Sequence, residues 1–498
     1  MTSPTLTKPD IENNYPHLAT GRSALALAGV VWSSVQTLIP TISAAVVFFV
    51  SAMFLAPSDF GLVGLASGLV MTVMAFTPVA FGEALIQRKE LAKTHADSVF
   101  WLTLGFGVLC FLPLLIWATP IATLLGDTTI AAILPVLALR IPLDLAAAVP
   151  NGMIARSMKF KLIALRTAVA TLVSVTICMI MLFADYGYWA LVGSQISGSL
   201  VACAMAFWVA KWRPGLSFKL QSLRDLARYG VFASGNRMLA TVKIDHLVLG
   251  ILAGPAVLGL FFFAQRLYLM LTQLVGGALS SVTLALLSTL QDDAGKTAKA
   301  FGMASYLSAA VSMPMFCALS IAAPTILELL LDDKWTGAVF AVQAFCIAGV
   351  LAGIGVVQAS LIKAQNKADW WFWYQLVQQT TSVFVIAVTA SFGLPVLMIA
   401  LMAKSVLLWP ISVIMTAKLL RCSPWDYLAS FIAPIVATAA MAVGMLTVPT
   451  LVPDYPGFLQ LALQLTSGLI IYAPLILILS RDRIADLRRH FTKKVPAK

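Results

Sequence analysis

The chain is poor in charged residues. They make up 11% of its 498 positions, whereas hydrophobic residues make up 60%. A water-soluble protein of this length needs far more charge to cover its surface. The composition therefore excludes a soluble globular protein and favours one that lies in a lipid bilayer.

Cysteine and histidine are scarce and scattered. Five of the six cysteines lie inside apolar stretches, no CxxC pair occurs, and the four histidines are far apart. Neither a disulfide framework nor a zinc site is expected. The chain also lacks the GxxxxGK motif, completed by Ser or Thr, that binds the phosphates of ATP. We therefore expect no metal, no cofactor and no ATP hydrolysis.

Long apolar segments recur along the whole chain. About 20 apolar residues cross a hydrocarbon core of roughly 30 Å. Fourteen segments reach that length, so we predict an all-α polytopic membrane protein with about 14 transmembrane helices. The predicted spans are 24–54, 60–81, 98–118, 130–152, 163–183, 188–210, 230–253, 257–288, 300–324, 338–361, 372–391, 396–417, 427–448 and 457–479. The first and eighth are long, and bends are expected at Pro40 or at Gly276-Gly277.

Lys and Arg fall on alternate connections between these segments. Lys334 is the only cation on the opposite side, which also receives Asp59, Asp127, Asp185, Glu328, Asp332, Asp333 and Asp454. This bias places both termini in the cytoplasm. The formal net charge of +12 thus describes a membrane topology rather than nucleic-acid binding. Residues 1–22 lack the features of a signal peptide and are expected to form a cytoplasmic tail.

Short motifs repeat with an offset of about 206 residues. Leu124 to Asp127 corresponds to Leu329 to Asp333, and a basic turn follows each after one span. We predict two six-helix lobes around a central cavity, as in secondary transporters. The predicted parts are a tail (1–22), an N-terminal lobe (23–210), an inter-lobe loop (211–225), a C-terminal lobe (226–420), two additional transmembrane helices (421–480) and a basic cytoplasmic tail (481–498).

Five cations lie at membrane depth against two clear acidic companions. Each ionised side chain facing lipid costs at least about 2.5 to 3.5 kcal/mol, so these groups are expected to line a cavity. The excess of positive charge suggests an anionic guest, and arginine suits phosphate oxygens. The candidate binding residues are Arg140, Arg237, Arg266, Lys243 and Lys404, and the counter-ion or coupling candidates are Asp245, Asp144 and His246.

Simpler roles compete with this one. Arg140 and Asp144 are four residues apart and could only neutralise one another. Asp245 could be a counter-ion to a neighbouring cation, His246 a satisfied residue of the bundle, and Lys404 bonded to backbone carbonyls. The aromatic run 370–374 is expected to anchor a helix at the membrane interface.

Three motifs carry a family resemblance. Residues 55–62 (LAPSDFGL), 84–89 (ALIQRK) and 155–160 (ARSMKF) together resemble the Wzx-type polysaccharide exporters of the multidrug/oligosaccharidyl-lipid/polysaccharide flippase superfamily, those for colanic acid and succinoglycan above all. The resemblance implies a flippase of the bacterial inner membrane. It would translocate an undecaprenyl-diphosphate-linked oligosaccharide for exopolysaccharide or lipopolysaccharide biosynthesis. It implies no site residue by strict motif, and the family is often described with twelve spans.

The expected function is therefore transport without covalent chemistry. Its partners would be the lipid-linked oligosaccharide, membrane lipids, a coupling ion (H⁺ or Na⁺), and a polysaccharide polymerase with a chain-length regulator. Three alternatives remain: a lipid II flippase of peptidoglycan synthesis, a multidrug cation antiporter, and a membrane polysaccharide polymerase or glycosyltransferase. The antiporter needs an anionic cavity. The enzyme needs a sizeable loop with paired carboxylates.

Overall fold

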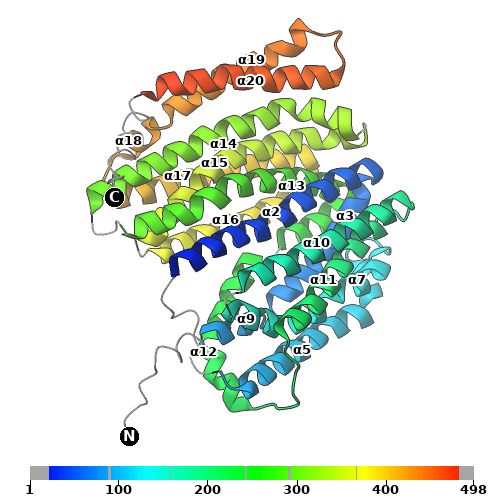
Figure 1. Ribbon diagram of the computed structural model, residues 1–498. Coiled ribbons are helices and arrows are strands. Elements are labelled where there is room, and N and C mark those ends of the chain that lie inside the picture. The colour runs from blue at the N-terminus through cyan, green and yellow to red at the C-terminus, as the bar shows by residue number, and fades with distance from the viewer. Residues whose placement is uncertain are drawn as a thin grey trace. The chain divides into compact units, whose positions relative to one another are not determined.

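The computed structural model describes residues 22–87, 91–157, 159–241, 244–289, 293–331, 333–365 and 367–481. Helices make up nearly all of this part of the chain, which contains no β-strand (Figure 1). Twelve described helical segments are long and apolar enough to cross a membrane. The predicted class, an all-α polytopic membrane protein, is confirmed. The count of fourteen spans stays a prediction.

The chain divides into two compact units, residues 1–258 and 259–498. The predicted inter-lobe loop, 211–225, lies within the first unit, and the predicted domain boundaries remain predictions. The helices of the first unit are α2 (Arg22–Phe54), α3 (Pro57–Ala75), α4 (Phe81–Gln87), α5 (Lys93–Ile116), α6 (Ala118–Leu124), α7 (Ile130–Ala138), α8 (Arg140–Ala146), α9 (Ala148–Arg156), α10 (Phe160–Phe183), α11 (Trp189–Ala210) and α12 (Leu220–Thr241).

Helix α13 (Ile244–Thr289) runs from the first unit into the second. The second unit continues with α14 (Ala294–Leu331), the 3₁₀ helix η2 (Asp333–Ala338), α15 (Val339–Ala364), α16 (Ala368–Thr389), the 3₁₀ helix η3 (Ala390–Phe392), α17 (Leu394–Leu420), α18 (Pro424–Ala429), α19 (Ile432–Leu451) and α20 (Gly457–Leu479). Its buried core includes Phe301 and Met313 of α14, Val357 of α15 and Tyr427 of α18.

A glycine breaks α13 into two helices. Gly254 has φ 80° and ψ 171°, a conformation essentially limited to glycine, and Pro255 follows it. The break falls in the gap expected between the seventh and eighth spans. Helix α13 is helical through Gly276-Gly277, and α2 continues as a helix through Pro40.

Prolines divide the predicted fourth span into the three short helices α7, α8 and α9. Pro142 and Pro150 have no N–H for the carbonyls four residues earlier, and α7 and α8 end at those residues, Ala138 and Ala146. Arg140 therefore begins α8, beside an interruption of the helix. The three pieces still cover one span-length segment, Ile130–Arg156.

The loop after α11 is bound to the start of α5. The buried carboxylate of Asp97 accepts hydrogen bonds from Gly215 N at 3.0 Å and Ser217 Oγ at 2.7 Å. Trp101 Nε1 donates to the Gly215 carbonyl at 2.8 Å. Trp212 packs edge-on against Phe100. These contacts fix the point from which α12 starts.

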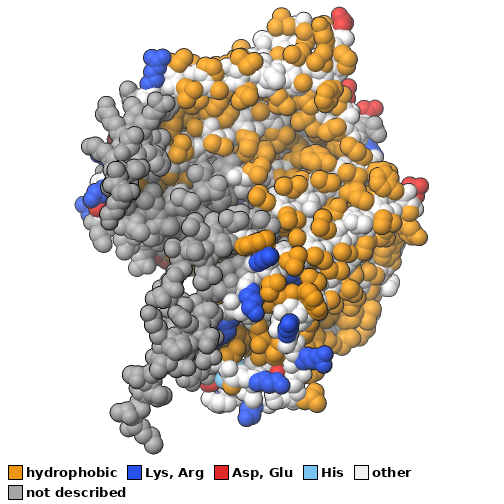
Figure 2. All heavy atoms as spheres, viewed as in Figure 1, with side chains coloured by type: hydrophobic (Ala, Val, Ile, Leu, Met, Phe, Trp, Pro, Cys, Tyr) orange, Lys and Arg blue, Asp and Glu red, His pale blue; other side chains and the backbone are white. Residues whose placement is uncertain are grey.

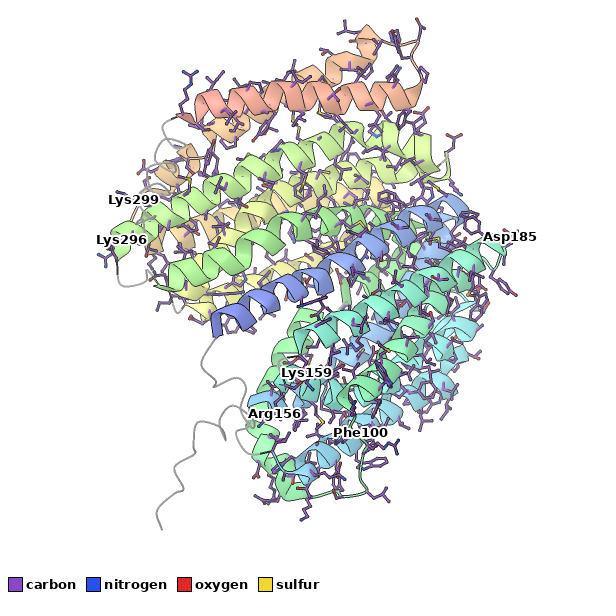
Figure 3. The ribbon with its side chains drawn as sticks, in the orientation of Figure 1. Phe100, Arg156, Lys159, Asp185, Lys296 and Lys299 are labelled. Atoms are coloured by element: carbon purple, nitrogen blue, oxygen red, sulfur yellow. The ribbon has the colours of Figure 1, made fainter. Side chains whose placement is uncertain are left out.

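Charge separates along the helices of each unit. In the first unit, Arg156 and Lys159 lie at one end of α10 and Asp185 at the other (Figure 3). In the second unit, Lys296 and Lys299 lie at the start of α14. Figure 2 shows hydrophobic side chains over the flank of the first unit and Lys and Arg side chains gathered near one end of it. This pattern agrees with the charge bias of the sequence.

Candidate functional site

The predicted site residues fall in both units. Arg140, Asp144, Asp245 and His246 belong to the first unit, and Arg266 and Lys404 belong to the second. Arg237 lies on α12, but its side chain is outside the described part of the structure, and Lys243 is outside it altogether. The description below therefore takes each unit by itself.

Arg140 is held by neutral side chains of α11. Its Nε donates to Ser199 Oγ at 3.2 Å and its Nη1 donates to Gln195 Oε1 at 2.6 Å. Gln195 Nε2 in turn donates to Ser67 Oγ of α3 at 3.2 Å. The network joins α3, α8 and α11 across the interior of the first unit. Sequence reasoning missed Gln195 and Ser199, although their i, i+4 spacing places both on one face of a helix.

Asp144 and Arg166 extend this polar cluster. Asp144 contacts the Ser199 hydroxyl and lies within electrostatic range of Arg140 and Arg166. Arg166 Nη1 donates to Asn151 Oδ1 of α9, while its Nε is buried without a hydrogen-bond partner in the described structure. Sequence reasoning did not include Arg166 among the candidate site residues. The cluster thus has two arginines and one carboxylate, joined by neutral amides and hydroxyls.

Asp245 and His246 begin α13. Asp245 Oδ2 is 3.8 Å from His246 Nε2, and both residues are buried. The other carboxylate oxygen, Oδ1, is also buried and has no hydrogen-bond partner in the described structure. His246 packs beside Gly68 of α3. A Cβ atom added to Gly68 would lie 3.8 Å from His246 Cβ. A buried carboxylate oxygen without a partner is costly unless a bound group supplies one.

Arg266 lies on α13 within the second unit and is partly buried. The described residues provide no hydrogen bond or ion pair for it. It therefore differs from Arg140, whose guanidinium is already bonded to two side chains. A guanidinium without partners retains its five donors for a ligand.

The second unit contains a cavity of about 710 Å³. It is lined by residues of α13, α15, α16 and α17. On α15 the lining runs from Ala348 to Lys363, which is about 22 Å along a helix at about 1.5 Å per residue. No Asp or Glu occurs among the described residues that line it. The volume lies within the range of small-molecule binding sites.

Polar side chains and aromatic rings share this cavity. Lys404 lines it, and its Nζ donates to Ser382 Oγ at 2.8 Å. Gln378 Nε2 donates to the Tyr374 hydroxyl at 2.8 Å. Of the predicted cations, Lys404 is thus placed in a cavity by the structure. The other polar and aromatic lining residues are Tyr268, Thr272, Ser360, Lys363, Trp371, Gln375, Gln379, Ser405, Trp409 and Ser412.

Helix α16 has two different faces. Residues 371, 374, 375, 378, 379 and 382 recur at steps of three and one, and all six line the cavity. Trp373 lies on the opposite side, Phe372 lies at the edge of the stripe, and both are exposed. The aromatic run expected at the membrane interface is therefore divided, with Trp371 and Tyr374 in the cavity. Helical spacing could have revealed this polar stripe in the sequence.

The model of the family described as polysaccharide biosynthesis protein matches residues 50–340. This is more than half of the chain. The chain belongs to this family. The three motifs of the sequence resemblance lie inside the matched range, and the resemblance to polysaccharide exporters is confirmed.

Three relatives are named for the biosynthesis or transport of polysaccharides. The succinoglycan biosynthesis transport protein ExoT of Rhizobium meliloti (strain 1021) is 25% identical over 352 residues, covering 69% of this chain and 70% of the relative. The lipopolysaccharide biosynthesis protein WzxC of Escherichia coli (strain K12) is 24% identical, covering 69% and 70%. The teichuronic acid biosynthesis protein TuaB of Bacillus subtilis (strain 168) is 22% identical, covering 84% and 87%.

Two solved structures share the fold of this family member. The lipid II flippase MurJ in its inward closed conformation has a TM-score of 0.72 at 13% identity, covering 91% of this chain and 100% of that chain. An inward-facing multidrug resistance transporter of the MATE family has a TM-score of 0.60 at 16% identity, covering 79% and 99%. The chain is therefore a multi-pass membrane protein with a transporter fold.

Proposed function

We propose that this protein is a flippase that moves lipid-linked oligosaccharide units across the cell membrane for polysaccharide assembly. The observation that carries the proposal is the cavity of the second unit, a space of about 710 Å³ lined by both polar and apolar side chains and without a described carboxylate. Such a space suits a polar guest that is neutral or anionic. Membership in the polysaccharide biosynthesis family supports it, as do relatives named for succinoglycan transport and lipopolysaccharide biosynthesis.

The guest is an oligosaccharide carried on undecaprenyl diphosphate. A diphosphate cannot enter hydrocarbon unaided, because an unpaired charge there is prohibitively costly. Arg140 and Arg237 of the first unit and Arg266 of the second lower that cost by attracting the phosphate oxygens, with Lys243 and Lys404 as weaker candidates. Arg266 is the best placed of the described arginines, since no described side chain competes for it.

Release requires that something replace the phosphate at these cations. Asp245 serves this role by exchanging a proton or Na⁺, because its Oδ1 is buried without a described partner and its Oδ2 lies beside His246. Asp144 acts in the same way for Arg140, since its carboxylate lies within electrostatic range of that guanidinium. The cycle is alternating access driven by an ion gradient, without covalent chemistry.

The protein acts in the bacterial inner membrane with both termini in the cytoplasm. The charge bias of the connections supports this orientation. On the outer side, a polymerase and a chain-length regulator receive the transported units.

Deletion of the gene tests the function. We expect loss of the exported glycan while its lipid-linked repeat unit is still completed and accumulates on the cytoplasmic leaflet. Radiolabelled lipid extracts measure whether the repeat unit is completed. A lectin or antibody added to one side of oriented vesicles measures the leaflet on which it accumulates. The gene supplied from a plasmid restores export and serves as the control.

Two results would contradict the proposal. If the lipid-linked repeat unit is never completed, the protein is an enzyme of assembly. If lipid II accumulates instead and the cells lyse, the protein serves peptidoglycan synthesis.

A further inference from the structure

We infer that the cavity of the second unit is a carbohydrate subsite, which binds the sugar rings of the transported unit, while the diphosphate binds mainly to the arginines outside this cavity. The inference rests on the proposed function and specifies which part of the substrate this cavity holds. Its evidence is the direction of the hydrogen bonds in the lining and the placement of the aromatic rings.

The hydroxyl groups of the lining are mostly acceptors. Three Ser and Thr hydroxyls of the cavity donate to backbone carbonyls of their own helices, and each oxygen can still accept a hydrogen bond from a guest. Ser382 is the clearest case: it donates to the Gln378 carbonyl at 2.9 Å and accepts from Lys404 Nζ at 2.8 Å. The other two are Thr272 and Ser405.

The glutamines of α16 add groups that both donate and accept. Gln375, Gln378 and Gln379 each carry an amide oxygen, an acceptor, beside an NH₂ donor. A diphosphate has acceptor oxygens alone, so it could bind the two lysines of the lining but cannot satisfy these acceptors. A sugar hydroxyl both donates and accepts, so it can. The lining therefore matches a polyhydroxylated ring better than it matches a phosphate.

Aromatic rings supply the second requirement of a sugar site. Trp371, Tyr374 and Trp409 all line the cavity, and the rings of Trp371 and Tyr374 lie 5.2 Å apart in a tilted arrangement. The C–H face of a pyranose ring is apolar and packs on such rings, while its hydroxyl edge reaches polar groups. Tyr374 is fixed by its hydrogen bond from Gln378, so one ring and one amide are positioned together.

Binding to the purified full-length protein in lipid nanodiscs tests the inference. The first probe is the repeat-unit oligosaccharide, released from its lipid by mild acid and free of phosphate. The second probe is inorganic pyrophosphate. We expect Trp371→Ala to weaken oligosaccharide binding about tenfold, because a buried Trp anchor dominates many binding sites. Trp371→Phe retains most of the affinity, and pyrophosphate binding does not change.

A matched control lies two residues away. Trp373 belongs to the same aromatic run but is 61% exposed on the other face of α16. Trp373→Ala should bind the oligosaccharide like the wild type. If Trp371→Ala does not fold, Gln379→Leu takes its place, since it removes one amide of the lining and leaves the rings intact. It should also weaken oligosaccharide binding and spare pyrophosphate.

The outcomes separate this inference from the proposed function. Equal oligosaccharide affinities in wild type, Trp371→Ala and Gln379→Leu would overturn the inference. So would a wild-type protein that restores glycan export to deletion cells but does not bind the oligosaccharide. Loss of pyrophosphate binding in Trp371→Ala would overturn it too, because the cavity would then hold the phosphates. A wild-type protein that neither restores export nor binds the oligosaccharide overturns the proposed function itself.

Discussion

The intramembrane cations are not equivalent at the scale of the residue. The guanidinium of Arg140 is bonded to Gln195 and Ser199, whereas Arg266 has no bonded partner among the described residues. A partly buried cation without partners loses hydration and gains nothing in return. A bound anion would supply what is missing. Arg266 is therefore the cation whose removal should affect function most directly and stability least.

We expect Arg266→Gln to reduce glycan export by at least about tenfold, because a hydrogen bond to a charged group contributes roughly 1.5 to 3 kcal/mol. Arg266→Lys should retain part of the function, since lysine keeps the positive charge but lacks the forked hydrogen-bond donors of the guanidinium. Export is measured in deletion cells at matched expression. Normal export by the double variant Arg237→Gln, Arg266→Gln would rule out the anion-site assignment.

Asp245 is the residue in which ion coupling can be tested. Asp245→Asn removes a buried charge without changing the shape of the side chain. We expect the variant to lose the dependence of transport on pH or membrane potential that the wild type shows in proteoliposomes. The reason is that a neutral amide can exchange neither a proton nor a cation. The wild-type and variant proteins are compared at several external pH values and with an imposed potential.

The control for this experiment is Asp185→Asn. Asp185 is exposed, lies at one end of α10 (Figure 3) and has φ 56°, which Asn tolerates well. This variant should follow the wild-type profile. Identical pH and potential profiles for Asp245→Asn and the wild type would exclude Asp245 as the coupling group.

At the scale of the element, two helices depend on local features that hydropathy does not show. Helix α16 turns polar and aromatic side chains toward a cavity and apolar ones outward, with Phe384 66% exposed. Its glutamines lower its hydropathy, and it is absent from the twelve span candidates. Helix α13 is divided by Gly254, which allows two helices to follow each other without a loop.

We expect Gly254→Ala to destabilise the protein by about 1 to 3 kcal/mol. No atom within 4 Å would clash with the new Cβ, so the cost comes from φ 80° alone. The melting temperature in detergent should fall. Gly105→Ala on α5 is the matched control, because its Cβ also meets open space and its backbone is helical. It should melt at or above the wild-type temperature, since Ala favours a helix. Equal melting temperatures of the two variants would show that the backbone conformation at position 254 is not restricted to glycine.

At the scale of the whole molecule, the open question is the orientation in the membrane. The charge bias predicts that the connection before α14 is cytoplasmic and that the connection between α19 and α20 is external. Lys299 and Asp454 represent the two connections, and both are exposed. Their positions allow the predicted topology to be tested within one unit.

We expect Asp454→Cys to react with an impermeant maleimide added to intact spheroplasts, and Lys299→Cys to react only after permeabilisation. The background lacks the six native cysteines, all of which are free thiols. That background without an added cysteine is the control for labelling. Labelling of both positions from outside would contradict the predicted topology.

The sequence by itself determined the class and the family of this protein. A bilayer requires long apolar helices whose backbone groups are bonded internally, so span-length segments and their flanking charges can be read without contacts. The predicted gap between the seventh and eighth spans, 253 to 257, coincides with the break at Gly254. The motifs 55–62, 84–89 and 155–160 sufficed for the family.

Only the tertiary structure decided which side chains meet. It showed that Arg140 is bonded to Gln195 and Ser199 rather than held by Asp144 alone, and that Trp371 and Tyr374 line a cavity instead of only anchoring a helix. Hydropathy measures the average polarity of a segment, whereas a binding site depends on which residues of several helices face the same space. That choice is made by packing between segments distant in sequence, as for α13, α15, α16 and α17 around one cavity.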